Sequence, residues 1–359
     1  ADSFPLNSFL PADSLGIVDL ALQARGTGFD PLLPRTRTSL RAQIGRAEFG
    51  GRDFGGIELD AELDSQRLSG RISDRDEALR LLLSVSGTLT EREQRIGLSG
   101  SVFGFDLAAL GVSPEPISGS FALDASASAA GKGAYAARIA LDSIEIRNKH
   151  RTDRIRPTSV SLHTDSAATR AEAASGDLSL TFSTPQSADS LIAALTRSAR
   201  TLAGQIDAQS IDMEQLKPAL PDFALRVSAG PDNILNSLLK SRKIAFDALN
   251  AEGANCDSLP VSIRLRTEGL AYGNVVLDTV TADIRQNGKR LEYALGLANA
   301  PGNLDNIARA GLYGHLVRNT GQANLYQRNR AGREGFRFGL DVTWTDSLVR
   351  ASVTPPDPL

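Results

Sequence analysis

Hydrophobic and polar residues alternate along much of the chain with a period of two, the pattern of a β-strand that has two different faces. The segment 79–89 shows it most clearly, with Leu79, Leu81, Leu83, Val85 and Leu89 alternating with Arg80, Ser84, Ser86 and Thr88. Similar runs lie at 57–64, 117–128, 135–146, 177–182, 261–270, 275–284 and 291–297. The pattern predicts about twenty short strands, roughly 8 to 12 residues apart.

Turn-forming residues separate these runs. The clearest turns are Gly50-Gly51-Arg52-Asp53, Ser73-Asp74-Arg75-Asp76, Asn287-Gly288-Lys289 and Asn319-Thr320-Gly321. Asn-Gly supplies the positive φ angles that a tight hairpin needs. Parallel strands would need a helix after each strand, and such helices are missing from the pattern. We therefore expect an antiparallel meander.

Helical periodicity is confined to the middle of the chain. The first helix is expected to be capped by Thr184, with Pro185 at its first position, an apolar face at Leu191, Ile192, Leu195 and Leu202, and its end at Gly204. Further helices are expected from Ser210 to about Pro218 and over 231–241, with shorter turns at 106–110 and 303–310. These elements divide the chain into a β-rich segment 1–183, a helical insert with one short strand at 184–241, and a second β-rich segment 242–359.

Composition and charge exclude several classes of function. Apolar residues make up 41% of the chain and aromatic residues 5%, and the net charge is −3. No basic stripe is present, so the sequence does not predict nucleic-acid binding. The single cysteine, Cys256, cannot form an internal disulfide or a cysteine metal cage. The longest apolar runs are far shorter than the roughly 20 residues that span a bilayer.

Candidate catalytic and metal-binding motifs all have a simpler explanation. His150, His163 and His315 lack a second histidine or cysteine at ligand spacing. The segment 74–77 lacks the spacing and central glycine of an EF-hand loop. Glu58, Asp60, Glu62 and Asp64 share one strand face, which is expected to face water. The segment 97–100 lacks the spacing of a nucleophile elbow, and Gly26-Thr27-Gly28 lacks the third glycine of a dinucleotide loop. The sequence therefore predicts no enzyme and no cofactor.

Three segments carry a resemblance to the TamB (translocation and assembly module) branch of the AsmA-like proteins. They are the strand and Gly-x-Gly step before Asp-Pro at 20–31, the strand, small turn and alternating strand at 46–60, and the helix with a following run of strands from 230–239. The resemblance covers most of the chain and rests on the order of these pieces. It implies an elongated antiparallel sheet, curled lengthwise into a trough (a β-taco) with an apolar interior.

The resemblance also implies a function and a location. It implies a bridge-like protein in the periplasm, anchored in the inner membrane through a segment not present here. Its partners would be phospholipid acyl chains and, through regions outside this fragment, an outer-membrane protein of the Omp85 type. The role implied is phospholipid transport and outer-membrane biogenesis. The chain starts at Ala1 without a signal peptide and has a turn-like end at 354–359, so we expect an internal fragment.

The residues expected to line the lipid groove are the apolar members of the alternating runs. They are Leu79, Leu81, Leu83, Val85, Leu89, Ile96, Leu98, Phe121, Leu123, Ile139, Leu141, Leu178, Leu180, Phe182, Ile263, Leu265, Leu295 and Leu297. A sheet with one apolar face must cover that face by curling, by stacking a second sheet or by holding lipid. About twenty strands spaced by about 4.8 Å would extend roughly 95 Å, which suits a conduit.

Two alternative functions remain open from the sequence. One is a scaffold for outer-membrane protein assembly or secretion, which would use exposed sheet edges for strand addition together with an Omp85-type partner. The other is a secreted glycan-binding or glycan-cleaving β-solenoid. The solenoid ranks last because sugar stacking needs aromatic residues, and only Trp344 and five tyrosines are available besides phenylalanine.

Overall fold

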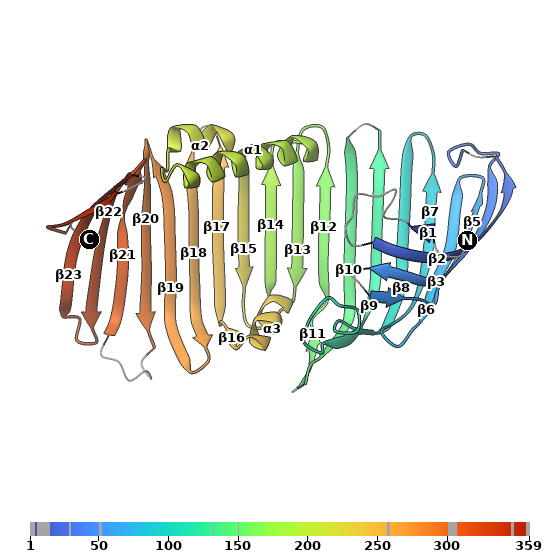
Figure 1. Cartoon of the computed structure of the whole chain (residues 1–359), viewed down its shortest axis with the longest axis horizontal. Helices are drawn as coiled ribbons and strands as arrows, with labels where there is room; N and C mark the ends of the chain where they lie inside the picture. The colour runs from blue at the N-terminus through green and yellow to red at the C-terminus, as the bar shows by residue number, and fades with distance from the viewer. Residues whose placement is uncertain are drawn as a thin grey trace. The chain divides into compact units, whose positions relative to one another are not determined.

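The chain forms two compact units in a computed structural model, Ala1–His163 and Thr164–Leu359 (Figure 1). The structure describes residues 4–5, 15–28, 30–49, 52–131, 133–149, 151–256, 259–300, 307–345 and 348–356. Each unit is built from one antiparallel sheet. The units are described separately below.

The first unit contains strands only. In chain order these are β1 (Phe4–Pro5), β2 (Leu15–Thr27), β3 (Arg37–Phe49), β4 (Arg52–Phe54), β5 (Ile57–Asp64), β6 (Arg67–Arg75), β7 (Leu79–Leu89), β8 (Glu93–Asp106), β9 (Ser118–Ala130), β10 (Ala134–Arg147), β11 (Thr152–Ile155) and, at its boundary, β12 (Thr158–Thr164). From β2 to β10 each long strand pairs with the next long strand along the chain. In Figure 1 β2 and β3 run across the direction of β9 and β10, so this sheet curls strongly between its two ends.

The second unit contains the other strands and the three helices of the described chain. The strands are β13 (Thr169–Ser175), β14 (Leu178–Thr184), β15 (Phe223–Ala229), β16 (Ile244–Ala245), β17 (Ala248–Cys256), β18 (Leu259–Tyr272), β19 (Val275–Asn287), β20 (Arg290–Asn299), β21 (Ile307–Val317), β22 (Thr320–Asn329), β23 (Glu334–Thr345) and β24 (Leu348–Thr354). The helices are α1 (Ala188–Asp207), α2 (Met213–Ala219) and α3 (Ile234–Ser241).

The strands of the second unit also pair in chain order. β14 pairs with β13 and β15, β15 pairs with β17, and the meander continues to β24. Among the described residues no pairing joins β13 to β24, so the sheet is open. The predicted fold class, a curled antiparallel sheet with a few short helices, is confirmed, and the helices lie in the second unit. The helices fill the connections β14–β15 and β15–β16 and leave the sheet continuous.

The helix boundaries differ from those predicted. Thr184 does not cap α1, because it is the last residue of β14 and pairs with Thr169. Ser187 is the N-cap, and its hydroxyl oxygen accepts a hydrogen bond from the N–H of Ser190. Gly204 does not end the helix, since a single glycine costs only about 1 kcal/mol inside a helix. α1 continues for one more turn to Asp207.

The other two helices begin three residues later than predicted. Asp212, and not Ser210, caps α2, because Ile211 is held by a β-bridge to Arg318. Asn233 caps α3, which ends at Ser241 as predicted.

The predicted turns have mixed outcomes. The hairpin turn at Asn287-Gly288-Lys289 and the turn at 106–110 are confirmed. The turn predicted at Ser73–Asp76 is wrong in position, since β6 runs to Arg75 and the chain turns after it. The turn predicted over 303–310 is wrong for residues 307–310, which belong to β21, and its first part lies outside the described residues, as do Gly50 and Gly51.

Candidate functional site

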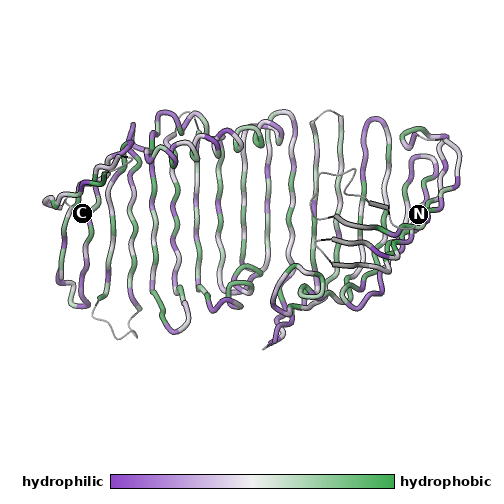
Figure 2. Tube along the Cα trace, viewed as in Figure 1, coloured by the Kyte–Doolittle hydropathy of each residue, from purple (hydrophilic) through white to green (hydrophobic). Residues whose placement is uncertain are grey.

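One face of the first unit is apolar from β2 to β10. The registers place one residue of each long strand in a single row across this face. In strand order the row is Leu22, Ala42, Leu59, Ile72, Leu83, Gly100, Leu123 and Leu141. Directly paired residues of antiparallel strands share a face, so the row is a continuous apolar stripe across the strands. Figure 2 shows the alternation of hydrophobic and hydrophilic residues along each strand that produces it.

The second unit has an equivalent apolar face. Its central row is Ala173, Leu180, Val227, Ala251, Leu265, Ala282, Leu295, Leu312, Leu325 and Phe338. A neighbouring row on the same face is Phe182, Leu225, Gly253, Ile263, Ile284, Tyr293, Gly314, Ala323 and Leu340. We call the apolar face of each unit its floor.

Every residue predicted to line a groove lies on a floor. Those between Leu79 and Leu141 lie on the floor of the first unit, and those between Leu178 and Leu297 lie on the floor of the second. Their contact with lipid stays a prediction. Floor residues that the sequence-based set did not include, such as Leu40, Ile72, Ile284 and Leu312, follow the same alternation and needed only a full application of it.

The floors remain partly open to solvent. In the first unit Leu22 is 57% exposed and Ile139 47%, and in the second Ile263 is 45% exposed and Leu295 43%. Single exposed apolar residues are ordinary on protein surfaces, but rows that run across many strands are not. The chain therefore buries some floor residues, such as Leu83, and leaves others in each row open to solvent.

The opposite face of each sheet is polar and carries ion pairs across the strands. Arg41 Nε lies 2.6 Å from Asp60, Arg226 Nε 3.2 Å from Glu252 and Arg285 Nε 2.7 Å from Glu292. The predicted water-facing position of the carboxylates on β5 is confirmed. Because these pairs are exposed, each contributes about 1 kcal/mol or less to stability.

A shallow hollow of about 650 Å³ lies on this polar face, over β2, β3, β5 and β6. Its charged lining consists of Arg25, Arg41, Asp60, Glu62 and Arg71. The lining side chains alternate in sign along the pairing direction, so the hollow is explained by the ladder of ion pairs on this face.

Asp74 is a charged residue on the apolar floor. It pairs in register with Leu81 and is 5% exposed. Burial raises the pKa of its carboxyl above the ordinary value, and a hydrogen bond of 2.9 Å from the N–H of Asp76 opposes that rise. The predicted lack of a calcium site there remains a prediction. Among the described residues, no group of three or more His, Cys, Asp or Glu side chains could hold a metal ion.

The Asp74→Asn variant should gain stability relative to the wild type as the pH rises. With its pKa raised in the folded state, Asp74 favours folding below the ordinary value of 3.8, and that contribution is lost as the pH rises through the folded-state pKa. Asparagine does not titrate and its Oδ1 can still accept from Asp76. Urea midpoints of both proteins, measured from below pH 3.8 up to neutral pH, test this. A constant difference across that range would contradict it.

In the second unit, helices lie at both ends of the strands that form the floor. At one end the N–H of Ala188, the first residue of α1, donates to Thr164 Oγ1 at 3.0 Å, and Thr169 Oγ1 donates to the carbonyl of Gln186 at 2.8 Å. Thr169 is paired with Thr184, which lies two residues after Phe182 on the same face of β14, and both threonines are buried. α1 therefore begins on the floor side of the sheet.

At the other end of the strands, α3 is held by buried asparagines. The side-chain amide of Asn236 donates to the carbonyl of Phe246 at 2.8 Å, and the N–H of Ile234 donates to Ser175 Oγ at 3.1 Å. Asn236 is fully buried. The floor between α1 and α3 is thus bounded at both strand ends.

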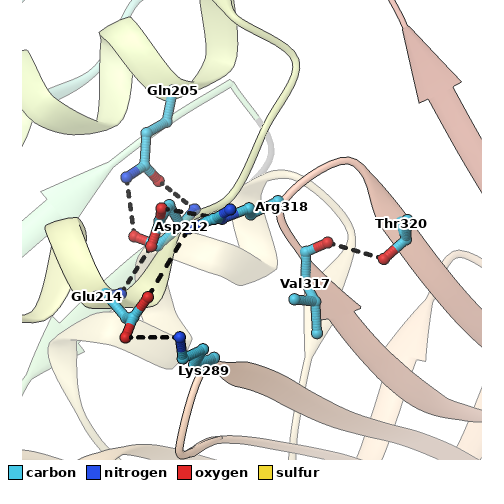
Figure 3. A network of polar contacts seen from close by, with 7 residues as sticks. All are labelled: Gln205, Asp212, Glu214, Lys289, Val317, Arg318 and Thr320. Carbon is cyan, nitrogen blue, oxygen red and sulfur yellow. Dashed lines mark hydrogen bonds and ion pairs between the residues drawn. The ribbon is translucent and has the colours of Figure 1, made fainter.

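A polar network fixes the far end of α1 to the β21–β22 hairpin (Figure 3). Gln205 and Asp212 exchange two hydrogen bonds of 2.9 and 3.1 Å, and Ile211 and Arg318 exchange backbone hydrogen bonds of 2.9 and 2.8 Å. Arg318 Nε also lies 3.3 Å from Asp212 Oδ2, and Lys289 Nζ lies 3.1 Å from Glu214. The indole N–H of Trp344 donates to the carbonyl of Gln209. The segment α1–α2 is therefore anchored at both ends.

Removing Asp212 should loosen this anchor. Asp212→Ala loses the cap of α2, in which its carboxylate accepts from the N–H of Glu214 at 2.9 Å, as well as the ion pair with Arg318. The expected cost is about 1–2 kcal/mol. It should appear as faster hydrogen exchange over residues 205–219. The control is Glu214→Ala, which loses only exposed ion pairs worth about 1 kcal/mol or less. Equal exchange in the two variants would show that the cap does not hold the segment.

The remaining candidate residues do not form a cluster. His163 lies in β12, His315 in β21 on the polar face, and Cys256 at the end of β17. His150 lies outside the described residues. Within the described ranges, no helix has the length and apolar character needed to cross a membrane.

Comparison with known proteins adds no relative: no protein-family model, curated protein or solved structure matches the chain.

Proposed function

We propose that this protein binds the acyl chains of phospholipids along its apolar floors and has a transport role rather than a catalytic one. The observation that carries the proposal is the unbroken apolar row across each sheet, together with the exposure of several of its members. In this role the chain is a segment of a TamB-type bridge between the inner and outer membranes. It would serve phospholipid transport to the outer membrane and outer-membrane biogenesis.

The energetics favour an apolar occupant. Exposed apolar surface costs about 25 cal/mol per Å², and several floor residues of each unit stay exposed in the chain itself. A buried acyl methylene contributes about 0.8 kcal/mol. The floor side chains are mainly leucine, isoleucine, valine and alanine, which can adapt to hydrocarbon chains without selecting one. An acyl chain therefore suits both the extent and the chemistry of the surface.

The cellular setting is part of the same proposal. A periplasmic location, an inner-membrane anchor outside this chain and an Omp85-type partner follow from the resemblance of the segments 20–31, 46–60 and 230–239 to the TamB branch. The polar face, with its exposed ion pairs, would then face the aqueous periplasm.

Purified protein should carry phospholipid. Solvent extraction followed by mass spectrometry measures the moles of phospholipid per mole of protein. We expect this ratio to be higher than for a globular protein of the same size that is expressed and purified in parallel. The reason is that many floor side chains stay exposed in the chain itself. Repeated recovery of protein without bound phospholipid or detergent, in a folded state shown by circular dichroism, would count against the proposal.

A second candidate function is favoured by β24. This strand pairs with β23, and its residues Leu348, Val349 and Val353 are 57%, 68% and 76% exposed. Such a strand could accept an incoming strand of an outer-membrane protein. Protein free of lipid that nevertheless binds extended outer-membrane strand peptides would support this scaffold role in place of lipid transport.

A further inference from the structure

Helix α1 carries an apolar stripe that the chain leaves uncovered. Ile192, Leu195, Ala199, Leu202 and Ile206 follow one another at spacings of three and four residues, so they share one side of the helix. Ile192 is 61% exposed, Leu195 51%, Leu202 42% and Ile206 64%. The sequence analysis expected Leu191, Ile192, Leu195 and Leu202 to share an apolar face, and the structure leaves Ile192, Leu195 and Leu202 of that face exposed.

The helix packs through a different side. The buried residues of α1 are Ala194, Ser198 and Gln205. Ser198 Oγ lies 2.6 Å from the carbonyl of Ala219, next to α2, and Gln205 bonds Asp212. At about 100° per residue, the apolar stripe lies about a quarter turn from this buried side. The charged residues Asp189, Arg200 and Asp207 lie on the opposite flank.

The direction of the stripe follows from the path of the helix. In Figure 1 α1 runs in front of the ends of β14 and β15 toward β18, and its first turn is bonded to floor-side threonines. The buried side of the helix meets α2 and the α1–α2 connection, so the apolar stripe, a quarter turn away, is left free to face the middle of the strands. The charged flank then faces away from the floor.

We propose that α1 is a fixed wall of the lipid groove in the second unit and that its stripe contacts acyl chains lying on the floor of β14–β18. The inference rests on the proposed function. The occupant is hydrocarbon because the stripe is wholly aliphatic and continues the surface of the floor. The stripe spans about 21 Å, so it crosses several strands. Because both ends of α1–α2 are anchored, the helix acts as a static wall and not as a mobile lid.

Site-specific photo-crosslinking in cells tests this wall. A photoreactive phenylalanine analogue is placed in the full-length protein at Leu195 or Leu202 on the stripe, at Leu265 on the floor, and at Arg197 or Arg200 on the other flank of α1. Phospholipids are labelled with radioactive orthophosphate, and the crosslinked protein is purified under denaturing conditions. We expect labelled phospholipid on the stripe and floor positions, at least about fivefold above the Arg197 and Arg200 positions.

The outcomes separate the wall from the function. Label at Leu265 but not at Leu195 and Leu202 would overturn the wall and leave lipid binding intact. Label at none of the positions would overturn the proposed function itself. Equal label at Leu195 and Arg197 would overturn the assigned direction of the stripe, and a protein adduct at the stripe in place of lipid would overturn the hydrocarbon occupant. Because all four helix positions are exposed, the substitutions should not disturb folding.

Discussion

Replacing Leu83 by aspartate should destabilise the first unit by about 3–5 kcal/mol. Leu83 is 7% exposed and lies in the floor row between Ile72 and Gly100. Leucine loses about 2–5 kcal/mol when truncated in a core, and an aspartate left there adds the cost of burying a charge without a partner. In urea, with a slope of about 1–3 kcal/mol per M, the midpoint of the unfolding transition should fall by more than 1 M.

The matched control is Ser84→Asp. Ser84 is exposed on the opposite face and pairs in register with Arg71 and Ser99, so a carboxylate there meets solvent and a cation. Its effect should stay within about 0.5 kcal/mol. Similar midpoints for the two variants would mean that β7 does not separate an apolar face from a polar one. Because Leu83 is buried within the protein, this pair of variants tests packing. A test of lipid contact needs a floor residue that is exposed.

The alternation of β7 shows what a single sequence can predict. A strand has a side-chain period of two. The alternation therefore assigns Leu81, Leu83 and Val85 to one face and Ser84 to the other, without knowledge of the neighbouring strands. The structure gives these faces, with Leu83 and Val85 on the apolar side and Ser84 on the polar side.

The rows across the strands could not be predicted in the same way. They depend on the register, and the register shifts at irregularities such as those between Arg80 and Leu81 and between Asp142 and Glu145. In the floor row of the first unit, Gly100 stands between Leu83 and Leu123. A larger residue does not fit there, because a Cβ would lie 2.2 Å from the carbonyl oxygen of Leu82. That close approach is a property of the paired backbone and has no local signature in the sequence.

Helix α1 illustrates a different limit. An amphipathic helix on a soluble domain usually buries its apolar face. Helix α1 instead packs through Ala194, Ser198 and Gln205, whose side chains are small or hydrogen-bonded to neighbouring backbone. The buried side is set by partners outside the helix, such as Asp212 and Ala219, which the periodicity of α1 does not contain.

Replacing Ile263 by aspartate should remove acyl-chain contact from the floor of the second unit while the protein stays folded. Ile263 is 45% exposed and lies between Gly253 and Ile284 on the floor that α1 and α3 bound. A charge facing hydrocarbon costs about 2.5–3.5 kcal/mol, and 1.4 kcal/mol corresponds to a tenfold change in affinity. We therefore expect the yield of phospholipid crosslinking from a photoreactive residue at Leu265, on the same face of β18, to fall by at least about tenfold.

Ser262→Asp separates this effect from a general disturbance of β18. Ser262 lies next to Ile263 on the polar face and pairs in register with Arg285, so an added carboxylate is solvated there and faces a cation. This variant should keep the crosslinking yield at Leu265, and both variants should keep urea midpoints close to that of the wild type because neither position is deeply buried. A tenfold loss in both variants would point to a local distortion of the strand. An unchanged yield in Ile263→Asp would mean that the hydrocarbon does not lie on the floor, since a carboxylate at this position cannot avoid a chain bound between Gly253 and Ile284.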